Sequence, residues 1–164
     1  MKHFIPLTLS LILHNDSVLL GMKKRGFGEG FWNGFGGKIK KGETIKEAAI
    51  RECKEEAGII VTQIEPRGTL RFSNEEDDKI LHVYVFVVKA YLGTPQETEE
   101  MRPQFFPLDK IPYKNMWPDD RYWIPLLLGG KYFFGTFHFS DDKTIKSYEL
   151  HECGKADVEK NMIQ

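Results

Sequence analysis

Three glutamates are crowded into the segment RECKEEAGI, residues 51–59. If this segment is helical, Glu52, Glu55 and Glu56 lie three and four residues apart on one side, where each pair of like charges costs about 0.2–0.5 kcal/mol. A solvated acidic face normally has lysines on the same stripe, whereas alanines share this one. Clustered carboxylates become favourable when Mg²⁺, which prefers oxygen ligands, binds among them. The spacing therefore predicts a site for a divalent cation.

The helix that would carry these carboxylates has clear start and stop signals. Thr44, followed three residues later by Glu47, has the pattern of a capping box. Gly58 stands where a left-handed residue often ends a helix. We therefore predict a helix over residues 45–57.

Hydrophobic patterning predicts strands on both sides of this helix, together with a second helix near the C-terminal end. The result is an α+β fold, a mixed β-sheet packed between α-helices. We expect one domain over residues 1–153 and a frayed tail over residues 154–164. The predicted strands are 4–14, 17–25, 67–73, 79–92, 104–108, 131–139 and 143–151, with a short extended piece near 31–36 and the second helix at 119–128.

Composition excludes several classes of function. The chain of 164 residues has a formal net charge of −1, which does not suit a nucleic acid polymer as partner. Cys53 and Cys153 are too few and too far apart for a disulfide framework, so we expect free thiols. No apolar run approaches the roughly 20 residues of a membrane helix. The apolar N-terminal segment alternates with Thr8 and Ser10, which favours a strand over a signal peptide.

Residues 37–59 resemble the Nudix box, the signature of a family of hydrolases that act on nucleoside diphosphates linked to another group. The resemblance covers every fixed position of the box. Only the cysteine departs in type, since an aliphatic residue is usual there, but cysteine packs as a small hydrophobe. The matching positions are Gly37, Glu43, Arg51, Glu52, Cys53, Glu55, Glu56, Gly58 and Ile59.

This resemblance implies roles for the box residues. The three helix glutamates would bind Mg²⁺, with Mn²⁺ as a substitute, and the Gly36 carbonyl and Glu100 would be further ligands. Glu56 is our first choice for the base that takes a proton from the attacking water. Arg51 would orient the glutamates, and Glu43 would be an outer carboxylate. On spacing alone, Glu100 is one of three glutamates in the segment ETEE.

Three further segments narrow the resemblance to the branch of the family that includes the animal MutT homologues. They are residues 19–38, 99–103 and 116–128, and the similarity runs from about residue 7 to about residue 150. This branch converts oxidised purine nucleoside triphosphates (8-oxo-dGTP, 2-oxo-dATP and 8-oxo-dATP) to the monophosphate and pyrophosphate. Its role is to keep damaged bases out of DNA by sanitising the nucleotide pool.

The segment MWPDD, residues 116–120, has a chemistry of its own. Asp119 and Asp120 are adjacent and follow Trp117. Capping of the second helix would explain one aspartate. In an aromatic pocket the two carboxyls would not both ionise easily, so one pKa should rise. The pair could then offer two acceptors, or one donor and one acceptor, to a purine. Stacking walls for the base would come from Trp117, Phe27, Phe72 and Phe139.

The closer resemblance adds residues to this pocket. It implies that Asn33 reads the base together with the two aspartates and that Lys23 lies near the substrate, where its charge suits a phosphate. Thr8 is a further candidate on the polar face of the first strand. The loop residues Phe35, Gly36, Gly37 and Lys38 would bring backbone close to metal and phosphate, and Pro118 completes the substrate-binding set.

We thus expect a monomeric enzyme with a small-molecule nucleotide substrate and no membrane partner. We expect it in the cytoplasm, with a nuclear or mitochondrial fraction left open. Two alternatives remain. The first is a Nudix hydrolase for nucleotide sugars, dinucleoside polyphosphates or RNA caps. The second is a catalytically silent Nudix module that binds a nucleotide or a protein.

Overall fold

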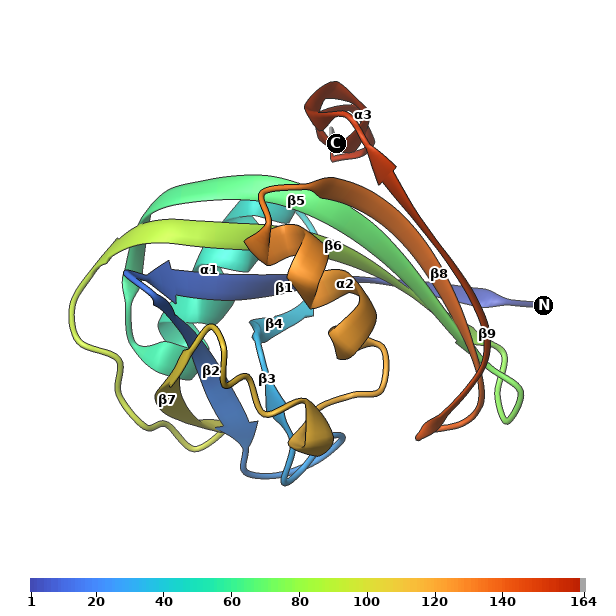
Figure 1. Ribbon diagram of the computed structural model, residues 1–164, viewed down its shortest axis with the longest axis horizontal. Helices are drawn as coiled ribbons and strands as arrows, with labels where there is room; N and C mark the ends of the chain where they lie inside the picture. The colour runs from blue at the N-terminus through green and yellow to red at the C-terminus, as the bar shows by residue number, and fades with distance from the viewer. Residues whose placement is uncertain (163–164) are drawn as a thin grey trace.

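The computed structural model describes residues 1–162 as a strongly curved sheet with helices on both sides (Figure 1). The sheet has nine strands in the order β3-β2-β1-β6-β5-β8-β9, with β4 paired to β1 and β7 paired to β2. The strands are β1 (His3–His14), β2 (Ser17–Lys23), β3 (Trp32–Asn33), β4 (Phe35–Lys38), β5 (Ile60–Asn74), β6 (Lys79–Leu92), β7 (Met101–Pro107), β8 (Tyr132–Asp141) and β9 (Thr144–Cys153).

The sheet is mixed, as predicted. The pairs β1–β6 and β5–β8 are parallel, and the other pairs are antiparallel. Strand β6 lies at the centre and shows how the two layers form. Its side chains alternate in direction, so Val83, Val85 and Val87 pack with helix α2, whereas Tyr84 and Phe86 pack with helix α1. The α+β fold with a sheet between helices is therefore confirmed.

The helices are short. They are α1 (Ile45–Ala57), α2 (Asp120–Leu128) and α3 (Lys155–Asn161), with a 3₁₀ turn η1 (Tyr113–Asn115) before α2. Within residues 1–162, no helix has the length and apolar character needed to cross a membrane. Both cysteines are free, and burial raises the pKa of the Cys53 thiol to about 12.

Strand β5 differs from its prediction, because it begins at Ile60 and not at residue 67. Its first half mixes Ile60, Val61 and Ile64 with polar residues and contains Pro66, so it lacks the regular alternation of a half-buried strand. The irregularity is visible in the structure as register shifts against β6, one of them between Pro66 and Gly68. Pairing with the long strand β6 extends β5 despite its local sequence.

The C-terminal tail also differs from its prediction. Residues expected to fray form α3, which contacts β5 and β8, and Val158 is fully buried. A helix of seven residues is marginal by itself. Burial of one apolar side chain against the sheet stabilises it. The last two positions of the predicted tail, 163 and 164, lie outside the described residues.

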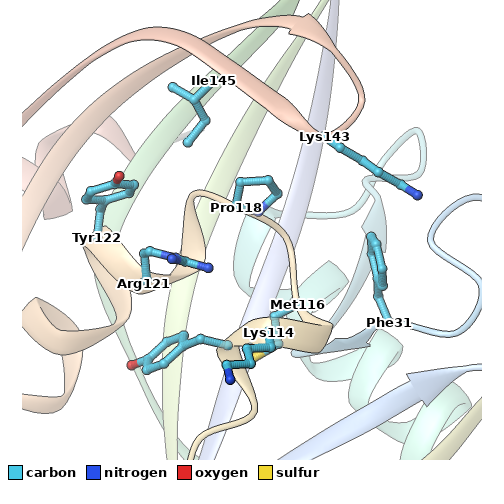
Figure 2. A pocket seen from close by; sticks show the side chains of 9 residues that line it. Phe31, Lys114, Met116, Pro118, Arg121, Tyr122, Lys143 and Ile145 are labelled. Carbon is cyan, nitrogen blue, oxygen red and sulfur yellow. The ribbon is translucent and has the colours of Figure 1, made fainter.

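A pocket opens between the start of α2 and the turn that joins β8 to β9 (Figure 2). It lies on the α2 side of the sheet, because Tyr113, Met116 and Ile145 belong to or pack against the core cluster that includes α2.

Candidate active site

Helix α1 has the predicted bounds, and its caps explain them. The Thr44 hydroxyl accepts a hydrogen bond from Glu47 N (3.1 Å), and the Glu47 carboxylate accepts one from Thr44 N (3.2 Å). Gly58 ends the helix with φ of 70°, in the left-handed region. These caps hold the glutamates in a fixed register against β4.

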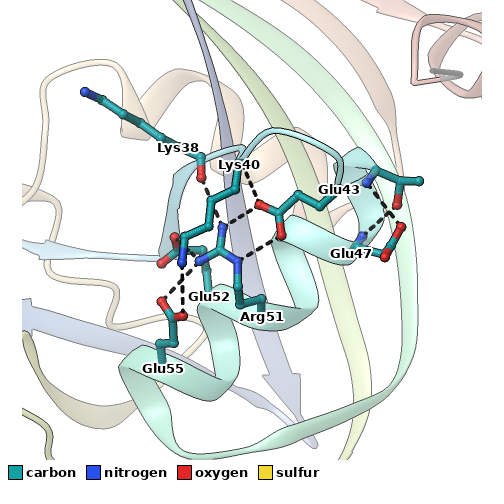
Figure 3. Close-up of polar contacts among 8 residues, drawn as sticks. Lys38, Lys40, Glu43, Glu47, Arg51, Glu52 and Glu55 are labelled. Carbon is teal, nitrogen blue, oxygen red and sulfur yellow. Dashed lines mark hydrogen bonds and ion pairs between the residues drawn. The ribbon is translucent and has the colours of Figure 1, made fainter.

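Arg51 contacts several carboxylates on the acidic face of α1 at the same time (Figure 3). Its guanidinium donates two hydrogen bonds to Glu43, of 2.9 and 2.7 Å. It also donates to Glu52 (2.8 Å), to Glu55 (3.1 Å) and to the Lys38 carbonyl (3.1 Å). Such a planar fork with several partners suits arginine and not lysine. Arg51 therefore contacts three carboxylates of the box at once, and its orienting role stays a prediction.

Replacing Glu43 by glutamine is expected to destabilise the fold in a pH-dependent way. The Arg51 guanidinium, with help from the Lys40 amide, holds the pKa of Glu43 down at about 2. A lowered pKa adds stability above the unfolded value of about 4.3, and that stability is lost as the pH falls towards 2. We expect the melting temperature of Glu43→Gln to lie below that of the wild type at pH 7. The gap should close between pH 4.5 and 2, as followed by circular dichroism. A gap that is constant over this range would contradict the argument.

Glu56 differs from the other helix glutamates because it is buried, with 5% of its surface exposed. Its carboxylate accepts a hydrogen bond from Gly36 N (2.8 Å). Burial raises the pKa of Glu56 to about 8; the carboxylates of Glu52 and Glu100 add to the rise, and the Gly36 bond and Lys23 oppose it. A carboxylate in such surroundings is a recognised sign of a functional site.

Two glycines of β4 let the backbone approach this carboxylate. A Cβ atom on Gly36 would lie 1.8 Å from the Thr8 carbonyl oxygen, and one on Gly37 would lie 2.6 Å from Glu52 Oε1. No side chain fits at either position without moving backbone or Glu52. Residues 35–38, expected as a loop, form strand β4 instead, which pairs with β1 and lies against α1, as the close approach of these glycines requires.

Glu100 lies beside a basic run at the end of β2. One of its oxygens accepts hydrogen bonds from Arg25 (2.7 and 3.2 Å), and the other lies 3.6 Å from Lys23 Nζ. Thr98 ties this loop to α1, since its hydroxyl donates to the Glu56 carbonyl (3.1 Å). Arg25 and Thr98, which contact predicted site residues, were not predicted from the sequence. The basic run MKKRG, residues 22–26, could have pointed to Arg25, whereas no pattern in the sequence singles out Thr98.

The glutamates predicted as metal ligands have the right chemistry for a divalent cation, but their side chains do not converge on one point. Glu52, Glu55, Glu56 and Glu100 supply the hard oxygen atoms that Mg²⁺ prefers. Strand β4 lies against two of these carboxylates, since Gly36 N donates to Glu56 (2.8 Å) and a Cβ atom on Gly37 would lie 2.6 Å from Glu52 Oε1. Within residues 1–162, however, no three acidic, histidine or cysteine side chains converge as metal ligands. Arg51 and Arg25 hold three of the glutamates, so metal binding requires these side chains to turn.

The adjacent aspartates are buried at the start of α2, with 4% of Asp119 and 2% of Asp120 exposed. Asp119 is the residue before the helix but makes no capping bond; its carboxylate accepts a hydrogen bond from Trp123 Nε1 (2.8 Å). Asp120 accepts one from Trp117 N (3.2 Å). Burial raises the pKa of Asp119 to about 6. Burial and the charge of Asp119 raise the pKa of Asp120 well above its usual range. The capping interpretation therefore fails for Asp119, and the pair has the predicted reluctance to ionise.

The predicted aromatic walls form two groups. Phe27 stacks on Trp117, with ring centroids 4.9 Å apart, and Phe31 meets the same indole edge-on at 5.1 Å. Phe72 stacks near Phe137 and Phe139 on the sheet, at 5.7 and 6.2 Å. Phe27 is 70% exposed, so this ring is available to a ligand.

Thr8, one of the predicted substrate residues, lies on the opposite side of the sheet from α2 and its aspartates. Leu7 and Leu9 pack in the cluster on the α2 side, so strand alternation turns Thr8 to the α1 side. Thr8 is buried there, and its hydroxyl has no hydrogen-bond partner within the described chain. The Asn33 side chain accepts a hydrogen bond from Gly34 N (2.8 Å). Pro118 follows Trp117 and lines the pocket in front of α2.

Comparison with known proteins gives consistent matches. The family model described as NUDIX domain matches residues 5–127. The oxidized purine nucleoside triphosphate hydrolase of Mus musculus is 52% identical over 88% of this chain and 93% of its own length. The Danio rerio protein of the same name is 47% identical over 89% and 94%. Among solved structures, a MutT protein from Bacillus halodurans matches with a TM-score of 0.80 and 27% identity, over 89% of this chain and 97% of its own.

Proposed function

The chain belongs to the Nudix hydrolase family, and from this premise we propose that it hydrolyses oxidised purine nucleoside triphosphates to the monophosphate and pyrophosphate. The two animal relatives have this activity in their names and match nearly the whole chain. The enzyme would act as a monomer on the free nucleotides of the cytoplasm. Its role would be to remove damaged nucleotides before they are copied into DNA.

The observation that carries the substrate assignment is the buried pair Asp119–Asp120. Two carboxyls that are 4% and 2% exposed cost folding free energy unless a proton or a ligand compensates them. With one proton on the pair, it can donate one hydrogen bond and accept another. Oxidised purines differ from normal ones in the donors and acceptors of the base edge, so a pair of this kind can select them. Trp117 and Phe27 would supply the stacking surface.

The phosphates would bind at the other acidic group. Glu52, Glu55, Glu56 and Glu100 would hold Mg²⁺, with the Gly36 carbonyl as a further oxygen donor. The metal would neutralise phosphate charge and lower the pKa of a bound water. Glu56 would accept the proton of the attacking water from its position beside the Gly36 amide, in the ionised form that a bound cation favours. Lys23, which already lies near Glu100 and Glu56, would contact a phosphate oxygen.

A substrate panel tests this proposal. We expect 8-oxo-dGTP and 2-oxo-dATP to be hydrolysed with kcat/KM at least about tenfold above that of dGTP, since one lost hydrogen bond in a buried site costs roughly 1–3 kcal/mol. Pyrophosphate release would be measured with Mg²⁺ at equal low concentrations of each nucleotide. Omission of metal should abolish release, and Mn²⁺ should restore it.

ADP-ribose and a dinucleoside polyphosphate serve as competing substrates in the same assay. Faster hydrolysis of either one would overturn the substrate assignment and leave the family assignment intact. If no compound is cleaved, the silent-module alternative holds, and the chain would then bind nucleotides without turnover.

A further inference from the structure

The pocket in front of α2 is separate from most of the site described above. Its volume is about 360 Å³. Of the residues predicted to bind substrate, it includes Pro118 alone. Its walls come from three places: Phe31 before β3, the segment from Tyr113 to Tyr122, and the turn between β8 and β9. A volume of this order suits a small organic ligand.

Three cations surround this pocket, and no carboxylate lines it among the residues described. They are Lys114, Arg121 and Lys143. None of the three has an ion-pair partner within residues 1–162. The two acids of the turn do not line the pocket: Asp141 accepts a hydrogen bond from Lys143 N, and Asp142 accepts one from the Asn74 side chain. Like charges around one hollow raise the local concentration of anions.

The acidic residues next to the pocket do not offset this charge. Asp119 and Asp120 are buried, and their carboxylates accept hydrogen bonds from Trp123 and from the Trp117 backbone. Both point into the protein and are absent from the pocket lining. The other charged groups of the surrounding elements thus leave the three cations unpaired.

Aromatic rings alternate with the cations around the hollow (Figure 2). Lys143 descends from the β8–β9 turn to lie over the Phe31 ring, 5.9 Å from its centroid. Arg121 reaches from the start of α2 towards Pro118, between Tyr122 and Phe31. A flat ring can stack on the aromatic walls while an attached anion meets the cations. This combination recognises a base with a phosphate.

We propose that this pocket is a second nucleotide site, which binds a nucleoside monophosphate without metal. Lys114, Arg121 and Lys143 contact the phosphate, and Phe31 or Tyr122 stacks on the base. The ligand is either the product of hydrolysis or a nucleotide that acts as an effector.

Calorimetric titration of the whole protein with AMP in buffer containing EDTA tests the proposal. AMP should bind the wild type, and a triple variant (Lys114→Gln, Arg121→Gln, Lys143→Gln) should raise the Kd about tenfold, the sum of three modest exposed charge contacts. Lys110→Gln, an exposed lysine outside the pocket, is the matched control and should leave the Kd unchanged. Asp120→Asn, in the neighbouring site, should leave it unchanged as well. Inorganic phosphate should bind at least tenfold more weakly than AMP.

Equal AMP affinity in the triple variant and the wild type would overturn the proposal, as would loss of AMP binding in Asp120→Asn. If inorganic phosphate bound as tightly as AMP, the aromatic rings would add nothing to the affinity, and the proposal would be overturned as well. Thermal unfolding checks that the triple variant is folded; if it is not, Lys143→Glu in the exposed turn must weaken AMP binding by itself. Titration with 8-oxo-dGMP, the product of 8-oxo-dGTP hydrolysis, and with dGMP separates product from effector. The assay involves no turnover, so its outcome does not depend on which triphosphate is hydrolysed.

Discussion

Replacing Glu56 by glutamine is expected to lower kcat by about 10²–10⁴-fold and at the same time to stabilise the metal-free protein at alkaline pH. The loss of rate is the usual contribution of a positioned general base. Glutamine keeps the size of the side chain and can still accept the hydrogen bond from Gly36 N. Pyrophosphate release under saturating substrate measures the first effect, and chemical denaturation in EDTA measures the second.

The gain in stability follows from the raised pKa. Burial raises the pKa of Glu56 to about 8 in the folded protein, compared with about 4.3 in an unfolded chain. The folded state therefore binds more protons between these two values, and the free energy of unfolding falls as the pH rises through them. Glutamine does not ionise, so the variant should lose this slope. At pH 8 the difference should be on the order of 4–5 kcal/mol in favour of the variant, and at pH 4 it should be close to zero.

The variant should lose kcat while its free energy of unfolding at pH 8 rises, so the two measurements together separate loss of the base from loss of structure. An inactive variant that is also less stable at pH 8 would mean that Glu56 supports the fold, which contradicts its assignment as the base. Unchanged kcat with raised stability would mean that another group takes the proton. Glu149→Gln is the control, because Glu149 lies on the exposed face of β9 and should change neither quantity.

The bounds of helix α1 could be predicted from the sequence because the residues that determine them are close in the chain. Its caps lie at Thr44, Glu47 and Gly58, and each acts within one turn of the residues it satisfies. The first half of β5 and helix α3 could not be read in the same way. Both depend on partners that are distant in the chain, since β5 pairs with β6 and α3 packs against the sheet. The intrinsic preference of a segment for helix or strand does not indicate which distant element it will pair with.

The same distinction divides the site. Arg51 and the glutamates of the box follow from helical spacing and from the family pattern. The bonds of Arg25 to Glu100 and of Thr98 to the Glu56 backbone join positions 75 and 42 residues apart. No spacing rule predicts them. The placement of Thr8 on the α1 side was also hidden, because strand alternation shows which residues share a face but not which helix covers it.

Replacing Asp120 by asparagine is expected to lower kcat/KM for 8-oxo-dGTP by about 10- to 100-fold. Asparagine fixes two hydrogens on its amide nitrogen and cannot share a proton with Asp119, so a carboxyl oxygen that can donate or accept is replaced by an atom that only donates. A mismatched buried hydrogen bond costs roughly 1–3 kcal/mol. The effect should be smaller for dGTP, so the variant loses selectivity more than activity. Asp109→Asn, at an exposed position outside the pocket, is the control.

Wild-type selectivity should itself depend on pH, because burial raises the pKa of Asp119 to about 6. Below that pH both aspartates carry protons; above it Asp119 becomes an acceptor while Asp120 keeps its proton. The ratio of kcat/KM for 8-oxo-dGTP to that for 2-oxo-dATP should therefore change across pH 6, since the two bases present different edges. A proton step common to both substrates, such as one at Glu56, cancels from this ratio. In Asp119→Asn the ratio should stay flat between pH 5 and 7.5. A flat ratio in the wild type would mean that the pair is structural and that selectivity arises elsewhere in the pocket.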